Sequence, residues 1–181
     1  MPKFPTPPLA DALPEGSYQV VDARDDIATI LVDPSALVSV CETLRDHPAL
    51  QFVICLDITA ADHLPRQPRI DLFYHLVSTG ERLTLRIKVQ LATIDDQVPT
   101  VSGVWKAANW LEREVWDLFG VTFTGHPQLE RLLTPDDWEG HPLRKDYPVQ
   151  VKLPVKTYAP LQLTEEEFRA NVEADRRLRR P

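Results

Sequence analysis

The most regular pattern in the chain is an alternation of apolar and polar side chains over Arg82–Leu91, "RLTLRIKVQL". Leucine, isoleucine and valine take every second position, and mostly polar residues take the positions between, which is typical of a strand buried on one side. Arg69–Val77 has a similar apolar face, and the turn residues Ser78–Gly80 join the two segments. The pattern predicts a β-hairpin over Arg69–Leu91.

Shorter patterns predict two more strands and a helix between them. Aliphatic and β-branched residues indicate strands at Asp25–Val32 and Gln51–Thr59, and we expect the second in the centre of the sheet. Pro34 is suited to the first position of a helix that Asp33 can cap. Its apolar face consists of Leu37, Val40, Cys41 and Leu44, and His47–Pro48 ends it.

A second helix is predicted over Val104–Phe119. Ser102 is a suitable cap before it, and Gly120 a suitable stop after it. The apolar stripe that would cover the sheet consists of Val104, Ala108, Leu111, Val115 and Leu118. From Gly120 to Pro148 no period is sustained, and a free loop of that length is unusual, so we expect other residues to hold it.

These elements predict an α+β fold, with helices against one face of a mainly antiparallel or mixed sheet. We assign residues 25–148 to a single domain that includes the long structured loop. Five prolines among the first fourteen residues suggest an extended arm over residues 1–24. Residues 149–181 are expected to form an extended tail with a short helix, opened by the capping box of Thr164 and Glu167.

Composition excludes several functions. A net charge of −7 and a pI near 5.2 argue against nucleic acid as a partner, because phosphate binding needs a surplus of Lys and Arg. The apolar runs are too short to span a bilayer, and the N-terminus lacks the apolar core of a signal peptide, so we expect a cytoplasmic protein. Cys41 and Cys55 are too few for a usual iron–sulfur cluster and are predicted to be buried free thiols.

The segment Glu139–Pro148, "EGHPLRKDYP", is rich in titratable groups, but an active site is not supported. His126 and His141 are each followed by proline, which suits turns better than a helical metal motif. Glu112 and Glu114 point to different faces of a helix and cannot share a substrate. The chain has no nucleophile elbow and no glycine-rich phosphate loop. A small soluble acid/base enzyme using one of the two histidines remains the rival hypothesis.

A protein-binding role fits these residues better. On its own, "ERE" at 112–114 would be a solvated helix face with Arg113 paired to Asp117. However, four tryptophans lie in or after this helix, and aromatic residues mixed with arginine are typical interface anchors. The candidates for partner docking or for clamping the loop internally are Glu112, Arg113, Glu114, Asp117, His126, Arg131, Trp138, His141, Arg144, Lys145, Asp146 and Tyr147. The sequence does not separate the two roles.

Trp105–Pro148 resembles the signature of the C-type subunit of respiratory complex I, the thirty-kilodalton subunit family of NADH:quinone oxidoreductase. The motifs "EREVWDLFG", "GHP" and "DDWEGHPLRKDYP" occur in the order and spacing of that family. Glu130 departs from it, because relatives usually carry a basic residue or proline there. The N-terminal half agrees only in its order of elements.

The resemblance implies a subunit with no catalytic residue, cofactor or metal of its own, bound in the peripheral arm at the cytoplasmic side of the bacterial inner membrane. Its implied partners are the D-type subunit of the quinone pocket and the iron–sulfur subunits. The Fe–S clusters, FMN and quinone would all belong to partners. Arg113, Arg144 and Lys145 would bind across or within the junction, while Trp138, His141 and Tyr147 would shape the loop. Equivalent subunits of ferredoxin-dependent oxidoreductases and membrane-bound hydrogenases are an alternative.

Overall fold

The computed structural model describes residues 6–23, 25, 27–148 and 164–178. They fall into two units, one within Met1–Tyr147 and the other within Pro148–Pro181. The first unit is an α+β domain built on a five-stranded sheet, which confirms the predicted fold class.

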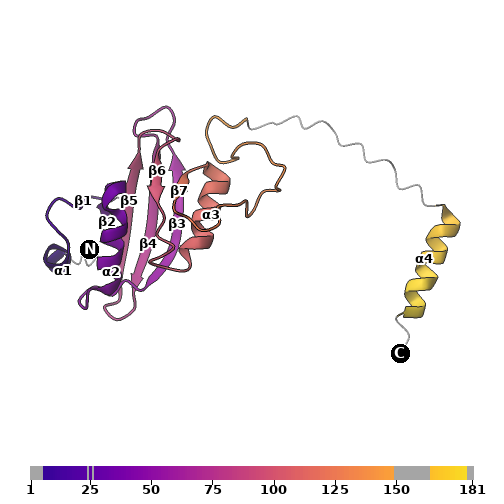
Figure 1. Cartoon of the computed structure of the whole chain (residues 1–181), viewed down its shortest axis with the longest axis horizontal. Coiled ribbons are helices and arrows are strands. Elements are labelled where there is room, and N and C mark those ends of the chain that lie inside the picture. Colours follow the sequence, from indigo (N-terminus) through magenta and orange to yellow (C-terminus); the bar gives the residue numbers. More distant parts are fainter. Residues whose placement is uncertain (1–5, 24, 26, 149–163, 179–181) are drawn as a thin grey trace. The chain divides into compact units, whose positions relative to one another are not determined.

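The sheet is mixed, with strand order β1-β2-β5-β4-β3 (Figure 1). Its strands are β1 Gln19–Val21, β2 Ala28–Leu31, β3 Ile54–Asp62, β4 Ile70–Ser78 and β5 Leu83–Leu91. β2 and β5 are parallel, and the other neighbouring pairs are antiparallel. The predicted hairpin is confirmed as β4 and β5. The central position predicted for the strand at Gln51–Thr59 is wrong, because β3 lies at the edge of the sheet.

Two helices cover one face of this sheet. The short 3-10 helix η1, Pro34–Ala36, leads into α2, Leu37–Asp46, whose buried residues are the four predicted. The second helix is α3, Ala108–Phe119. Cys41 of α2 and Ala108 of α3 pack in the same hydrophobic cluster as Tyr74 of β4, which places the two helices over the same face. A hydrogen bond of 2.9 Å from Arg45 Nη1 to the carbonyl of Val104 connects α2 to the approach to α3.

The predicted helix caps are wrong in two cases. Asp33 has an extended backbone but makes no side-chain capping bond. Ser102 does not begin α3, because residues 101–107 form turns and Ala107 takes the capping position. The turns allow Trp105 to enter the core, where its indole N–H donates to the carbonyl of Phe52 over 3.0 Å. Burial of the ring outweighs the local preference of serine for a helix start.

The core lies between the helices and the sheet. Its sheet side consists of alternate residues of the central strands, among them Ile30, Leu72, Leu76, Ile87 and Val89, all at or below 2% exposure. Full burial of each such side chain contributes about 1.5–3 kcal/mol. Cys41 and Cys55 are free and buried, as predicted.

The N-terminal part differs from its prediction. Thr6–Ala12 forms a helix, α1, and Leu9 and Leu13 are buried in the core. The expectation of an extended arm is therefore wrong for the described residues of 1–24. Pro7 and Pro8 lie in the first turn of α1, where the missing N–H groups would have no helical partner anyway.

After α3 the chain returns to a small second sheet. Gly120 ends the helix in the left-handed conformation, with φ 78°, as predicted. β7, Thr122–Thr124, then pairs in parallel with β6, Gln97–Pro99. These strands fix the start of the long irregular segment that follows.

The second unit contains α4, Glu165–Leu178, and the predicted capping box at its start is confirmed. The carboxylate of Glu167 accepts from the backbone N–H and hydroxyl of Thr164, and the Thr164 hydroxyl accepts from the Glu167 N–H. The tail predicted over residues 149–163 lies outside the described residues. Within the part of the chain that is described, none of the helices combines the length and apolar character needed to cross a bilayer.

Candidate functional site

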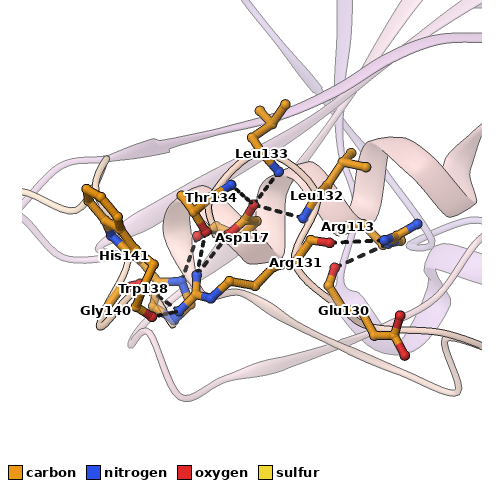
Figure 2. A network of polar contacts seen from close by, with 10 residues as sticks. All are labelled: Arg113, Asp117, Glu130, Arg131, Leu132, Leu133, Thr134, Trp138, Gly140 and His141. Atoms are coloured by element: carbon orange, nitrogen blue, oxygen red, sulfur yellow. Dashed lines mark hydrogen bonds and ion pairs between the residues drawn. The ribbon is translucent and has the colours of Figure 1, made fainter. Parts of the chain in front are cut away.

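Residues 125–147, here called the clamped segment, contain most of the predicted site residues. No helix or strand occurs within them. Charged side chains of α3 reach the backbone of this segment, and side chains of the segment reach back to the end of α3 (Figure 2). The expectation that something must hold this long stretch is confirmed by these contacts.

Asp117 of α3 is the principal acceptor. Its Oδ2 receives the backbone N–H groups of Leu132, Leu133 and Thr134, at 3.0, 2.7 and 2.9 Å (Figure 2). Its Oδ1 accepts from the Thr134 hydroxyl and, over 2.8 Å, from Arg131. Burial alone would raise the pKa of this fully buried carboxyl, but the Thr134 and backbone hydrogen bonds outweigh it and hold the pKa well below its usual range. The ionised carboxylate thus fixes a turn of the segment.

Arg131 extends this contact to the end of the segment. Besides Asp117, its guanidinium donates to the carbonyls of Trp138 and Gly140, at 2.7 and 3.2 Å. It also lies 5.7 Å from the centre of the Trp116 ring. An arginine guanidinium has five N–H donors in a fixed planar arrangement, so it can bind several acceptors in different directions. Arg131 therefore joins two turns of the segment to α3.

Arg113 does not pair with Asp117, so the alternative interpretation of this helix as a solvated face with that ion pair does not hold. Its Nε and Nη2 donate to the carbonyls of Glu130 and Arg131, at 3.2 and 3.1 Å. The guanidinium also lies 5.0 Å from the centre of the Trp110 ring. Only backbone atoms of Glu130 take part, so the departure from the family at this side chain leaves this contact intact.

Glu112 shows that "ERE" is not a solvated face, since its side chain and that of Asp117 are 0% exposed. Its carboxyl accepts from the Val101 N–H, over 2.7 Å, and from the Thr100 hydroxyl. Burial raises the pKa of Glu112 to about 7, although these two bonds oppose the shift. Glu114 is half-buried. Glu112 thus ties α3 to the end of β6.

His126 lies beside Glu112, with Nε2 3.8 Å from the Glu112 Oε2. The same Nε2 is 3.1 Å from the carbonyl of Asn109, and Nδ1 accepts the backbone N–H of Gln128. Nδ1 therefore accepts a hydrogen bond, and Nε2 faces the Asn109 carbonyl, to which it can donate. Both nitrogens are used by the backbone, so the ring fixes the start of the clamped segment.

His141 and Arg144 close over the left-handed Gly120. The His141 Nδ1 donates to the Asp117 carbonyl over 2.9 Å, and the Arg144 Nε donates to the Phe119 carbonyl over 2.6 Å. Burial lowers the pKa of His141. A Cβ on Gly120 would overlap the Arg144 Nη2. The side chains at this point thus cap the exposed carbonyls of the helix end.

Trp138 and Tyr147 form a stacked pair, with ring centres 6.5 Å apart. Tyr147 also lies against Gly140, where a Cβ would be 3.0 Å from the Tyr147 Cε2. This packing brings the two ends of "EGHPLRKDYP" together.

A second clamp was missed by the sequence analysis. Arg69 donates to both carboxylate oxygens of Asp62, at 3.0 and 2.7 Å, and pairs with Asp146 at 3.0 Å. Asp62 also accepts the backbone N–H groups of Lys145 and Leu64, at 3.0 Å each. The Arg69 bond holds the pKa of Asp62 well below its usual range. The available signal was the alternation in β3, which places Asp62 on the core-facing side with Ile58 and Ala60.

The outer surface of this region is apolar at several points. Trp110 is 58% exposed, Leu133 61% and Leu143 49%, while Lys145 and Asp146 are also exposed. Among the described residues, no group of three or more His, Cys, Asp and Glu is placed to hold a metal ion. The site thus directs its strongest hydrogen-bonding groups inward and large apolar side chains outward.

Comparison with known sequences gives consistent matches. Residues 30–152 match the family described as "Respiratory-chain NADH dehydrogenase, 30 Kd subunit". The NADH-quinone oxidoreductase C subunit of Roseiflexus sp. (strain RS-1) is 43% identical over 141 residues, covering 78% of this chain and 80% of the relative. The corresponding protein of Geobacter sulfurreducens is 48% identical over 134 residues, covering 72% and 82%.

Two solved structures have a similar fold. A trypsin-resistant fragment of Nqo5 has a TM-score of 0.53 and 31% identity, and the match covers 62% of this chain and 89% of the fragment. A chain of an archaeal respiratory membrane complex, the membrane-bound sulfane sulfur reductase, has a TM-score of 0.65 and 26% identity, with coverage of 80% and 83%. The second of these proteins belongs, by its name, to a multi-subunit respiratory complex.

Proposed function

Because this chain belongs to the family of the respiratory-chain NADH dehydrogenase 30 kDa subunit, we propose that it is a structural subunit, without a redox centre of its own, of a proton-translocating NADH:quinone oxidoreductase. The family membership confirms the resemblance found in Trp105–Pro148. In this role the chain holds the hydrophilic subunits in register, while neighbouring subunits carry FMN, the Fe–S clusters and the quinone. Its partners are the D-type subunit of the quinone pocket and the iron–sulfur subunits, in the peripheral arm at the cytoplasmic side of the inner membrane.

One observation carries this proposal: the charged groups around the clamped segment bind backbone atoms of the same chain, whereas Trp110 and Leu133 are exposed. An exposed tryptophan held in place is an effective anchor for another protein, because little side-chain freedom is lost on binding. Arg113 holds Trp110 in this way, because its guanidinium lies over the ring at 5.0 Å from the ring centre. The geometry supports a preformed docking surface.

The rival acid/base enzyme finds less support. His126 has both ring nitrogens occupied by backbone groups, and the His141 Nδ1 donates to the Asp117 carbonyl. Asp117 is saturated by five donors from the segment. A general acid or base must reach a substrate proton, and these groups are committed to the fold.

The identity of the larger complex is supported by the relatives. Those at 43–48% identity are named as C subunits of NADH-quinone oxidoreductase, whereas the chain of the sulfane sulfur reductase complex is 26% identical. The latter likeness keeps complexes with another electron donor as the second candidate. Co-purification separates them, because NADH-oxidising flavoprotein subunits accompany the chain only in the first case.

The docking test compares Trp110→Ala and Leu133→Ser with Val20→Ser. Val20 is a matched control, since it is also more than half exposed but lies on β1. Each chain is expressed in its own cells in place of the natural one, and the assembled complex is quantified with its NADH:quinone activity. We expect the site variants to lower the assembled fraction about tenfold or more, with unchanged thermal unfolding of the isolated chains. Normal assembly and activity of both site variants would exclude this surface.

The absence of a redox centre needs a separate measurement. Metal analysis and the visible absorption spectrum of the isolated chain are expected to show no iron and no flavin. Stoichiometric iron or flavin bound to the purified chain would overturn this part of the proposal without affecting the docking surface.

A further inference from the structure

The second face of the sheet, opposite α2 and α3, carries polar side chains. On β4 and β5 this face consists of the residues between the core positions: the polar His75, Arg86, Lys88 and Gln90 and the aromatic Phe73 are all partly exposed. None of them belongs to the clamped segment or to its contacts. This face is therefore a surface separate from the one described above.

One buried carboxylate organises the end of this face. Asp71 is 4% exposed, and its Oδ2 lies 2.9 Å from Lys88 Nζ, 3.1 Å from Arg66 Nη2 and 2.9 Å from His63 Nε2. Its Oδ1 accepts from the Gln90 amide over 3.0 Å. These five residues are called the Asp71 cluster.

The Asp71 cluster has more cations than it can neutralise. Arg66 and Lys88 each carry a full positive charge, while Asp71 supplies one negative charge. A guanidinium has five N–H donors and an ammonium three, and each of these two side chains contacts Asp71 through one nitrogen. Arg66 is 54% exposed, so its further donors are accessible from outside.

The neighbouring charged groups have the opposite balance, with one arginine and two aspartates, so the cationic surplus is confined to the Asp71 end of the face. Arg86 donates to Asp25 over 2.7 Å and to His75 Nε2 over 2.9 Å, and Asp57 lies 3.7 Å from the other nitrogen of His75. These groups form a second cluster toward the other end of the face. Between the two lies the Phe73 ring, with Lys88 and Arg86 each 5.9 Å from its centre.

We propose that the Asp71 cluster is a docking point for a carboxylate side chain of a neighbouring protein subunit, which binds to Arg66 and Lys88 while its apolar part packs on Phe73. This inference rests on the proposed function, since it needs an assembly that supplies the partner. Charge complementarity supports it: the chain as a whole carries −7 and repels acidic segments elsewhere, so a local cationic surplus directs such a segment to this place.

The test uses the intact complex with Arg66→Glu, Lys88→Gln and the control Arg82→Glu. Arg82 is exposed in the turn between β4 and β5 and undergoes the same charge reversal as Arg66. We expect the complexes with Arg66→Glu or Lys88→Gln to lose this subunit at a salt concentration that leaves the wild-type and Arg82→Glu complexes intact, with an assembled fraction lowered on the order of tenfold. Thermal unfolding of each isolated full chain shows whether it is folded; Arg66→Glu keeps the test valid if Lys88→Gln does not fold.

Carbodiimide cross-linking of the wild-type complex identifies the partner group directly. We expect a bond between Lys88 Nζ and an aspartate or glutamate of another subunit, absent from Lys88→Gln. Cross-links of Lys88 only to its own chain, together with normal salt resistance of Arg66→Glu, would overturn the inference while leaving the proposed function intact. Failure of the wild-type chain to join any complex would instead overturn the proposed function.

A lipid headgroup presents similar chemistry and is distinguished by a vesicle assay. The probe is a vesicle of phosphatidylglycerol and phosphatidylcholine, compared with phosphatidylcholine alone. We expect the isolated full chain to show no binding that depends on Arg66. Binding to the anionic vesicle that Arg66→Glu abolishes, with normal assembly of that variant, would assign the cluster to the membrane surface and overturn the protein partner.

Discussion

The carboxylate of Asp117 lies 2.9 Å from the backbone nitrogen of Thr134, seventeen positions further along the chain. This contact, with those to Leu132 and Leu133, makes a residue of α3 the acceptor for three consecutive N–H groups of the clamped segment. In a segment without a helix or strand, such a carboxylate accepts the backbone N–H groups that would otherwise pair with backbone carbonyls.

Asp117→Ala is expected to destabilise the domain by about 3–5 kcal/mol, because it leaves three N–H groups and the Arg131 guanidinium without their acceptor. Urea unfolding of the isolated chain measures this. Glu114→Ala on the same helix is the control and should change the free energy of unfolding by about 0.5 kcal/mol or less. Equal effects of both variants would show that Asp117 does not hold the segment.

Glu112 predicts a pH dependence of opposite sign to that of most carboxylates. Its pKa is about 7 in the folded chain against 4.5 for the unfolded reference, so the folded state retains the proton longer. The contribution of this group to the free energy of unfolding is fully present below pH 4.5. It is lost as pH rises through about 7, and the total loss is about 3 kcal/mol. Glu112→Gln removes this loss and keeps an acceptor for the Val101 N–H.

The measurement is urea unfolding of wild type and Glu112→Gln at pH 5 and pH 8. The variant should gain stability relative to the wild type between these values, while Glu114→Gln, the control, follows the wild type. Parallel stability curves for Glu112→Gln and the wild type would show that Glu112 is ionised across this range.

Asp62 predicts the pH dependence that is usual for a carboxylate: the stability of the fold decreases as pH falls. Its bonds to Arg69 hold its pKa below the reference of 3.8, so its contribution is present above that pH and is lost as pH falls below it. Asp62→Asn should cost about 3–5 kcal/mol at pH 7, because Arg69 loses its buried partner. The cost should shrink below pH 3.8; a constant cost down to about pH 2.5 would contradict the pairing. Asp22→Asn, at an exposed position, is the matched control.

Local patterns predicted the parts of the fold that depend on local physics. The strict alternation in Arg82–Leu91 predicted β5 within one residue, and Gly120 predicted the end of α3 because a left-handed residue is needed there. Ser102 failed because burial of Trp105 delays the helix. The proline content of residues 1–14 argues against a helix, but proline is tolerated in the first turn, and α1 therefore escapes a composition-based prediction.

Local sequence patterns could not predict the contacts that clamp the segment, for a different reason. Arg113 and Asp117 satisfy the local rule for an i, i+4 pair, yet each binds backbone groups fifteen or more positions away. The sequence could therefore name these residues but could not divide them between clamping and docking. The division depends on which carbonyl or N–H group the folded segment brings close to each side chain.

The packing around Gly120 is tested by a matched pair of substitutions. Gly120 and Gly125 have nearly the same positive φ, 78° and 79°, so Gly120→Ala and Gly125→Ala share the cost of placing a Cβ in this region, about 1–2 kcal/mol. They differ in space: a Cβ on Gly125 meets Thr100 Cγ2 at an ordinary 3.7 Å, whereas one on Gly120 would overlap Arg144 Nη2 and lie 2.5 Å from His141 Cδ2.

Gly120→Ala must therefore displace Arg144 and His141 from the carbonyls of Phe119 and Asp117. Urea unfolding should show a loss for Gly120→Ala at least about 2 kcal/mol larger than for Gly125→Ala, because two hydrogen bonds to helix-end carbonyls are broken. If the two variants lose the same stability, the backbone conformation accounts for the whole effect. Arg144 and His141 would then be dispensable for holding the clamped segment to α3.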